Sequence, residues 1–102
     1  MYTRFYLIIF SLVFRYNSRM KAKGKDMKTE FPEKYVTLGL KIAYYRRKEG
    51  YTQEQFAEMI DKSVSFVGQV EGPGMICGVS LETLFKMAQV LKISPSKLLE
   101  ED

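Results

Sequence analysis

The sequence predicts a compact all-α domain of five helices, preceded by a tail of different composition. Apolar residues recur at spacings of three and four across residues 34–99, which is the period of an amphipathic helix. Ser, Thr, Pro or Gly stands at the boundaries of these periodic segments, where helices start and stop. We therefore expect an apolar and basic tail with a linker over residues 1–26. Residues 27–102 should form one domain with a single core.

The first helix is predicted to begin near Pro32 or Lys34 and to end at Glu49. Proline is favoured in a first helical turn, and Gly50 supplies the stop. Its inward stripe, at the i, i+4, i+7 spacing, consists of Leu38, Ile42 and Tyr45.

The second helix begins at a capping box. Thr52 is a good N-cap, and Gln55 three residues later completes the box. Tyr51 and Phe56 flank the cap at the spacing of a hydrophobic staple, which fixes the direction of the incoming chain. The inward face of this helix is predicted to contain Phe56, Ala57 and Ile60.

A tight turn at Asp61-Lys62 separates this helix from the third. Asp tolerates the left-handed backbone that such a turn needs, and Ser63 can cap a helix that ends before Gly72. That helix has Val67 and Val70 on its inward face. Two helices of about two turns, joined by about three residues, form a helix-turn-helix unit.

The last two helices follow a longer loop. Gly72-Pro73-Gly74 predicts a turn, and Ser80 is the expected cap of a fourth helix over residues 81–91. Ser94 should cap a short fifth helix with Pro95 at its first position. The residues expected to face the core are Leu81, Leu84, Phe85, Ala88, Leu98 and Leu99.

Residues 5–14, FYLIIFSLVF, form an apolar run between Arg4 and Arg15. Ten residues span only ~15 Å as a helix, which is half of a bilayer core. A signal peptide would need a small-residue cleavage site, and none follows before Arg15. Three interpretations remain open: translation starts at Met20 or Met27, the run pairs two chains, or it anchors to a membrane surface.

Composition argues against an enzyme. The chain has no histidine, the commonest general base and metal ligand, and it has one cysteine, Cys77. No paired-carboxylate or nucleophile–base spacing is present. We expect no catalytic residue, metal or cofactor, no small-molecule substrate, and a reduced, cytoplasmic protein in which Cys77 packs under a loop.

The positive charge lies mainly in the tail. Residues 1–26 hold six Lys/Arg and one Asp, a net charge of +5. Residues 27–102 hold ten Lys/Arg and eleven Asp/Glu, a net charge of −1. The predicted domain is thus close to neutral, and its charge gives no independent indication of nucleic-acid binding.

Residues 38–99 resemble the phage-repressor class of helix-turn-helix domains, the Xre/Cro family. The matching segments are Ile42 to Arg46, Thr52-Gln53-Glu54 with Ala57, Val67 with Val70-Glu71, Ser80 to Leu84, and Leu91 to Leu99. They follow the family's order. The sequence departs from the family at Asp61-Lys62, where Gly and an apolar residue are usual. Its loop after Gly72 is also about two residues longer, and its third helix is poor in charge.

The resemblance implies a partner and a site. In this family the second helix of the motif lies in the major groove, and dimers span two half-sites. Carried over by position, Gln53, Lys62 and Ser63 would contact phosphates, with Lys41 or Arg47 as further cations. The residues that would face base edges are Val64, Ser65, Gly68 and Gln69. Arg46 and Glu71 would form a structural ion pair between the first and third helices.

Two hypotheses of function follow. The first is a sequence-specific DNA-binding transcriptional regulator, a repressor that binds a double-stranded operator as a homodimer. The second is a protein-interaction module of the same fold, because no Arg or Lys occurs from Ser63 to Val70 and Phe66 suits a protein partner as well as a groove. A membrane-tethered regulator is a distant third hypothesis, so a membrane partner is not expected.

Overall fold

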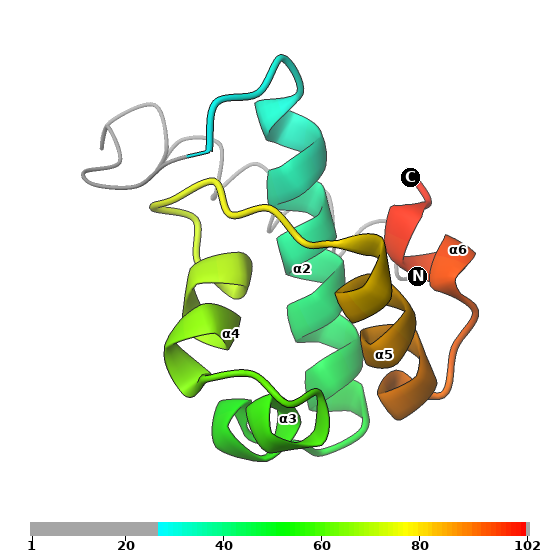
Figure 1. Cartoon of the computed structure of the whole chain (residues 1–102). Coiled ribbons are helices and arrows are strands. Elements are labelled where there is room, and N and C mark those ends of the chain that lie inside the picture. The colour runs from blue at the N-terminus through cyan, green and yellow to red at the C-terminus, as the bar shows by residue number, and fades with distance from the viewer. Residues whose placement is uncertain (1–26, 102) are drawn as a thin grey trace.

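Helix α2 is the central element of the fold (Figure 1). The computed structural model describes residues 27–101, and these contain five helices. They are α2 (Pro32–Lys48), α3 (Gln53–Met59), α4 (Val64–Glu71), α5 (Leu81–Leu91) and α6 (Pro95–Leu99). α4 packs on one side of α2, while α5 and α6 pack on the other, and α3 packs against α4. The predicted all-α class and the order of five helices are confirmed.

α2 begins and ends for the reasons that the sequence suggests. Pro32 occupies the first turn with Glu33, and three cations occupy the last turn, where they suit the negative end of the helix dipole. Gly50 then adopts a φ of +81°, a left-handed conformation that glycine reaches without a steric penalty. The backbone N–H of Tyr51 donates to the carbonyl of Arg46 at 3.1 Å. The chain thereby reverses directly into α3.

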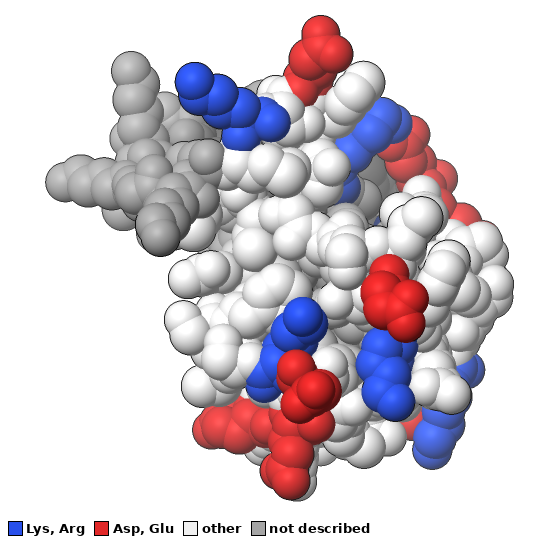
Figure 2. Space-filling view, in the orientation of Figure 1, with Lys and Arg blue, Asp and Glu red and all other residues white. Residues whose placement is uncertain are grey.

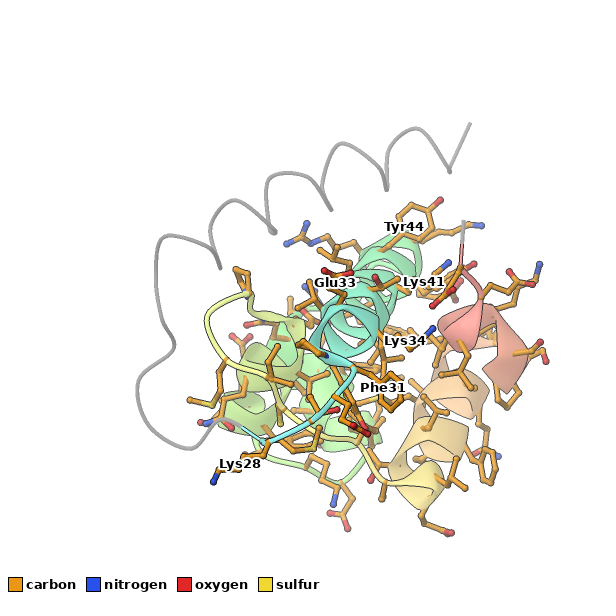
Figure 3. All side chains as sticks on the ribbon, turned by 90° about the horizontal axis from the view of Figure 1, so that it is seen from above. Lys28, Phe31, Glu33, Lys34, Lys41 and Tyr44 are labelled. Atoms are coloured by element: carbon orange, nitrogen blue, oxygen red, sulfur yellow. The ribbon has the colours of Figure 1, made fainter. Side chains whose placement is uncertain are left out.

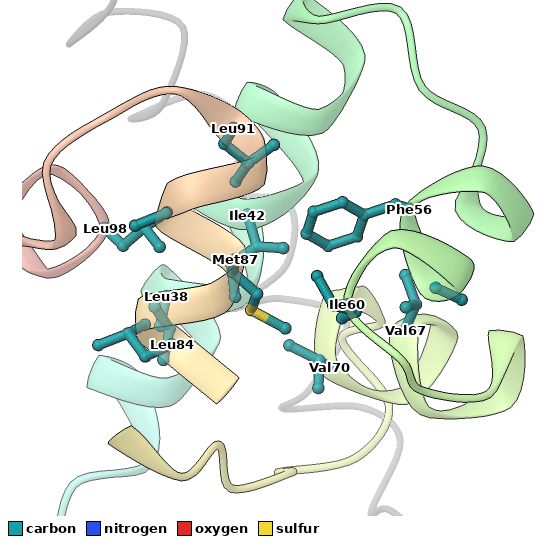
Figure 4. Close-up of a cluster of buried hydrophobic side chains, with 12 residues drawn as sticks. Leu38, Ile42, Phe56, Ile60, Val67, Val70, Leu84, Met87, Leu91 and Leu98 are labelled. Atoms are coloured by element: carbon teal, nitrogen blue, oxygen red, sulfur yellow. The ribbon is translucent and has the colours of Figure 1, made fainter. Parts of the chain in front are cut away.

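One apolar core lies between the helices (Figure 4). The side chains of Ile42, Phe56 and Met87 have no exposed surface, and they come from α2, α3 and α5 respectively. α4 contributes Val67 and Val70, both buried. The core therefore holds the helix-turn-helix motif against the rest of the domain.

The predicted inward face of α5 is partly wrong. Leu84 and Ala88 are buried, but Leu81 is 65% exposed and Phe85 is 52% exposed. The buried stripe lies one turn further along the helix, and it also contains Met87 and Leu91. Two overlapping apolar stripes with the same spacing exist in this segment, so periodicity alone could not choose between them. Packing against α2 selects the second stripe.

The expectation for α6 is also only half right. Leu98 is buried, whereas Leu99 is 58% exposed. A helix of only five residues can direct little more than one side chain into the core, and in α6 that side chain is Leu98. Ser94 is the N-cap residue and Pro95 the first helical residue, as predicted, although no side-chain hydrogen bond of Ser94 caps the helix.

The turns include two left-handed residues that are not glycine. Asp61 has a φ of +58°, as the sequence predicts for the turn between α3 and α4. Lys92 has a φ of +61° where a glycine is usual, a conformation that costs about 1–2 kcal/mol for such a residue. Gly72 ends α4 as predicted, but in an extended conformation. Glycine is needed there for space, because a Cβ would lie 2.8 Å from the carbonyl oxygen of Gly68.

Within residues 27–101, no helix is long and apolar enough to cross a membrane. The predictions for the apolar run at residues 5–14 and for the start of the domain concern residues that the structure does not describe.

Candidate nucleic-acid interface

Side-chain caps define the start of both helices of the motif. The Oγ1 atom of Thr52 accepts from the backbone N–H of Gln55 at 3.0 Å, and the side chain of Gln55 accepts from the N–H of Thr52 at 2.9 Å. The Oγ atom of Ser63 accepts from the N–H of Phe66 at 3.0 Å. The capping box and the Ser63 cap predicted from the sequence are confirmed. They fix the relative register of α3 and α4.

Arg46 and Glu71 form a nearly buried fork between α2 and the end of α4. The Nε atom of Arg46 donates to Oε2 of Glu71 at 2.7 Å, and Nη2 donates to Oε1 at 3.0 Å. The side chains are 7% and 5% exposed respectively. A third donor, Nη1, bonds the carbonyl of Tyr51 at 2.7 Å. The fork thus joins α2, α4 and the residue that precedes α3, in the arrangement that the family resemblance implies.

Gln53 belongs to the same network, which the sequence did not indicate. Its Nε2 atom donates to Oε1 of Glu71 at 3.0 Å, so this carboxylate oxygen accepts from both Gln53 and Arg46. An amide nitrogen carries two hydrogens. One hydrogen of Gln53 is therefore used inside the protein, and the other can still be donated to a ligand.

Gly39 allows α2 and α4 to approach, and the sequence analysis missed it. A Cβ at this position would lie only 2.2 Å from the carbonyl oxygen of Val70. Glycine inside a helix costs roughly 1 kcal/mol of stability relative to alanine. A glycine in the middle of α2, next to the buried Leu38, therefore indicates that another part of the chain packs closely against it. Gly39 fixes how deeply α4 is seated on α2, and hence which edge of α4 stays outside.

The outer edge of α4 carries small and uncharged side chains. Val64 is 46% exposed, Ser65 and Gln69 are exposed, and Gly68 is half-buried with open space where a Cβ would be. These four residues lie on one side of α4, opposite the buried Val67. The structure therefore brings the four proposed base-reading positions together on one exposed edge.

The turn before α4 adds a cation and a hydroxyl. Lys62 is exposed, and its Nζ atom lies 5.7 Å from the centre of the half-buried Phe66 ring, within cation–π range. Ser63 is exposed, and as a hydroxyl it can donate a hydrogen bond while its oxygen accepts the capping one. Lys62 and Ser63 thus offer two donors next to the first turn of α4.

Known structures with the same arrangement of helices identify the family. The restriction-modification controller protein C.AhdI from Aeromonas hydrophila is 33% identical, with a TM-score of 0.58, over 63% of this chain and 94% of that protein. This chain belongs to the phage-repressor-like family of helix-turn-helix proteins. SinR in complex with DNA is 28% identical, with a TM-score of 0.57, over 62% of this chain and 98% of that one. The N-terminal DNA-binding domain of SinR from Bacillus subtilis is 28% identical, with a TM-score of 0.60, over 66% and 96% of the two chains.

No protein-family model matches the sequence, and no curated protein matches it. The membership in the helix-turn-helix family therefore rests on solved structures, of which C.AhdI is covered almost completely.

The exposed charge around the helix-turn-helix motif is mainly negative, which does not favour the binding of a polyanion. Glu54, Glu58 and Asp61 are exposed on or just after α3, against the single cation Lys62. Figure 2 shows acidic side chains gathered over α3, at the lower edge of the visible face. Lys41, proposed from the sequence as a further phosphate contact, is only 2% exposed. A side chain that is almost fully buried in this way does not present its cation to a phosphate, so that suggestion is wrong.

The loop between α4 and α5 packs onto the helix-turn-helix domain. Residues 72–79 are all half-buried, and Cys77 packs against the core there, as expected from the sequence. Burial raises the pKa of the Cys77 thiol above its ordinary value, which disfavours the reactive thiolate. Across residues 27–101, no group of three or more acidic or Cys side chains could hold a metal ion.

Proposed function

We propose that this chain is a sequence-specific DNA-binding transcriptional regulator that acts in the cytoplasm as a dimeric repressor. The observation that carries the proposal is the exposed edge of α4, which lies on the second helix of a helix-turn-helix in a family whose member SinR has been solved with DNA. In such motifs this helix lies in the major groove. No role in catalysis is proposed.

Residues Val64, Ser65, Gly68 and Gln69 would meet base edges. A glutamine can bond the N6 and N7 atoms of adenine with both ends of its amide, and an apolar side chain can contact the methyl group of thymine. Gln69 and Val64 are therefore proposed to read A·T pairs. Gly68 has no side chain, so it allows the backbone of α4 to approach the bases closely.

Gln53, Lys62 and Ser63 would hold the phosphate backbone. The second amide hydrogen of Gln53 and the hydroxyl of Ser63 can each donate to a phosphate oxygen. Both side chains are oriented by internal hydrogen bonds, Gln53 by Glu71 and Ser63 by the N-terminus of α4. Such contacts fix the register of α4 on the duplex without reading sequence.

A second copy of the chain is proposed to bind at an apolar groove on the side of the domain that holds α5 and α6. Phe31, Leu81 and Leu99 are all more than half exposed, and they line a groove with a volume of about 610 Å³. Large exposed apolar surfaces mark interaction sites. An operator with two half-sites needs such a contact, because each copy supplies only one α4.

Footprinting on the DNA next to its own gene tests the proposal. We expect protection of two half-sites whose centres are about 34 Å apart along the duplex. Lys62→Ala should weaken binding to all sequences alike. It should also make the log–log dependence of affinity on salt shallower by about 1.8 for a dimer, since each phosphate contact contributes about 0.9.

The matched control is Lys86→Ala, which removes an exposed cation on α5 and should leave both the affinity and the salt dependence unchanged. If the chain protects no DNA, either near its gene or in a pool of random duplexes, the proposal is wrong. A protein complex that Phe66→Ala disrupts would then identify the helix-turn-helix as a protein-binding surface.

A further inference from the structure

We infer that Glu71 is a positioning residue for DNA binding, because its carboxylate fixes the amide of Gln53 in the orientation that donates to a phosphate. This role is distinct from the part that Glu71 plays in the ion pair with Arg46. The inference rests on the proposed function. It assigns part of the affinity for the phosphate backbone to a side chain that does not itself touch DNA.

Gln53 and Glu71 come from opposite ends of the helix-turn-helix motif. Gln53 is the first residue of α3, and Glu71 is the last residue of α4. Their side chains meet, because the Nε2 atom of Gln53 donates to Oε1 of Glu71 at 3.0 Å. Gln53 is half-buried, whereas the side chain of Glu71 is only 5% exposed. A ligand can therefore reach Gln53 from outside while Glu71 holds it from within.

The carboxylate decides which end of the Gln53 amide faces inward. An ionised carboxylate only accepts hydrogen bonds, so it bonds the NH2 group of a glutamine and not its carbonyl oxygen. One hydrogen of Nε2 is then bound to Glu71, and the other is left for a ligand that accepts, such as a phosphate oxygen. The terminal torsion of a glutamine is broad and roughly two-fold. Without Glu71 the amide would turn over, and its carbonyl oxygen would face the phosphate for part of the time.

Arg46 removes the electrostatic penalty of a carboxylate close to DNA. Its Nε and Nη2 atoms donate to the two oxygens of Glu71 at 2.7 and 3.0 Å. The pair has no net charge, so it does not repel a phosphate as an isolated carboxylate would. Because Oε1 accepts from both Arg46 and Gln53, the three side chains form one hydrogen-bonded network. Glu71 can thus hold a donor next to a polyanion.

Oriented uncharged donors matter here because cations are scarce near the motif. From residue 49 to residue 85 the only Lys or Arg is Lys62. Lys34 lies on the side of α2 that faces α6, as Figure 3 shows, and it pairs there with Glu101. Immobilising a flexible side chain on binding weakens affinity by about 2- to 12-fold. Gln53 avoids most of this loss, since Glu71 already holds it in the free protein.

The test is a double-mutant cycle on DNA affinity. One change is Gln53→Ala, and the other is the paired substitution Arg46→Met with Glu71→Leu, which removes the carboxylate without leaving a charge buried alone. Dissociation constants of the four full-length chains are measured by fluorescence anisotropy on the footprinted duplex and on a scrambled duplex. Urea unfolding establishes that each chain is folded under the conditions of the assay.

The paired substitution should weaken binding by about 2- to 12-fold per DNA-binding domain, and by the same factor on both duplexes. Gln53→Ala should weaken binding of the unmodified chain by on the order of 10-fold per domain. In the paired variant the effect of Gln53→Ala should be smaller by the factor that the paired substitution itself costs. The salt dependence should stay the same in all four chains, since no cation that meets a phosphate is lost.

The matched control is Lys62→Ala in the same two backgrounds. Lys62 lies in the turn before α4, so its effect should be equal in the unmodified chain and in the paired variant. If its effect shrinks together with that of Gln53→Ala, the paired substitution has displaced α4 as a whole, and the positioning role is refuted. If Gln53→Ala has the same effect in both backgrounds, Glu71 does not orient the amide, while the proposed function stands.

A measurement on the unmodified chain decides the question if the paired variant is unfolded. The two side-chain amide hydrogens of Gln53 are observed in a proton–nitrogen correlation spectrum and identified by their loss in Gln53→Ala. In the free chain one of them should exchange with water more slowly than those of the exposed Gln69, and the other should shift when the footprinted duplex is added. Exchange of both hydrogens as fast as in Gln69 would refute the role of Glu71. An unmodified chain that binds neither duplex refutes the proposed function and this inference together.

Discussion

Replacement of Arg46 by alanine should cost far more stability than the loss of an exposed charge in the described domain. The guanidinium makes three hydrogen bonds of 2.7–3.0 Å, two to Glu71 and one to the carbonyl of Tyr51. Without it, the Glu71 carboxylate stays 95% buried with the Gln53 amide as its remaining described partner. Breaking a buried ion pair in this way costs about 3–5 kcal/mol. A domain of this size has only about 4–11 kcal/mol of stability, so the substitution should remove at least about a quarter of it.

The assay is urea unfolding followed by circular dichroism, with Arg47→Ala as the matched control. Arg47 is exposed in the same helical turn, and its loss should change the free energy of unfolding by no more than about 0.5 kcal/mol. The double variant Arg46→Met with Glu71→Leu removes both charges. It should be more stable than either single variant, because no charge is left buried alone. Equal, small effects of Arg46→Ala and Arg47→Ala would refute this account of the fork.

The remaining stability predictions concern the glycines and the start of the domain. Gly39→Ala should destabilise the domain by about 1–3 kcal/mol, because the added methyl group would overlap the backbone of α4. Gly68→Ala has open space around it and should stabilise α4 by about 0.4–1 kcal/mol. Thermal melts that rank the two variants in the opposite order would contradict this packing. A chain that starts at Met27 should melt cooperatively at a temperature close to that of the full chain. If it is unfolded, residues 1–26 are part of the fold and the predicted domain boundary is wrong.

Local chemistry explains which parts of the fold could be predicted. Thr52, Ser63 and Ser80 each accept a hydrogen bond from a backbone N–H three residues later. The start of each of these three helices, α3, α4 and α5, is therefore encoded within four residues. The left-handed turn at Asp61 is equally local. Such features need no knowledge of the rest of the chain.

Contacts between helices were harder to predict. The segment of α5 is apolar on two adjacent stripes, and only its position against α2 decides that Met87 is buried and Phe85 is exposed. Gly39 was missed because its role depends on a carbonyl of α4, which is distant in the sequence. The Arg46–Glu71 fork came from the resemblance to a family, which carries such long-range information.

The candidate site was predictable as a set of positions, while its internal hydrogen bonds were not. Val64, Ser65 and Gln69 came from the resemblance to the family, and all three are exposed on α4 while Val67 is buried. The bond between Gln53 and Glu71 joins residues 18 positions apart across two helices, and no sequence pattern reports it.

The most direct test of the account is the effect of Gln69→Ala on sequence discrimination. Affinities of the unmodified chain and the variant are measured at one salt concentration on the footprinted duplex and on a scrambled duplex. The variant should lose about 1–3 kcal/mol on the footprinted duplex only, because a contact to a base edge is removed. The scrambled duplex should bind both proteins equally. An equal loss on both duplexes, or no loss on either, would contradict the claim that α4 reads the sequence of DNA.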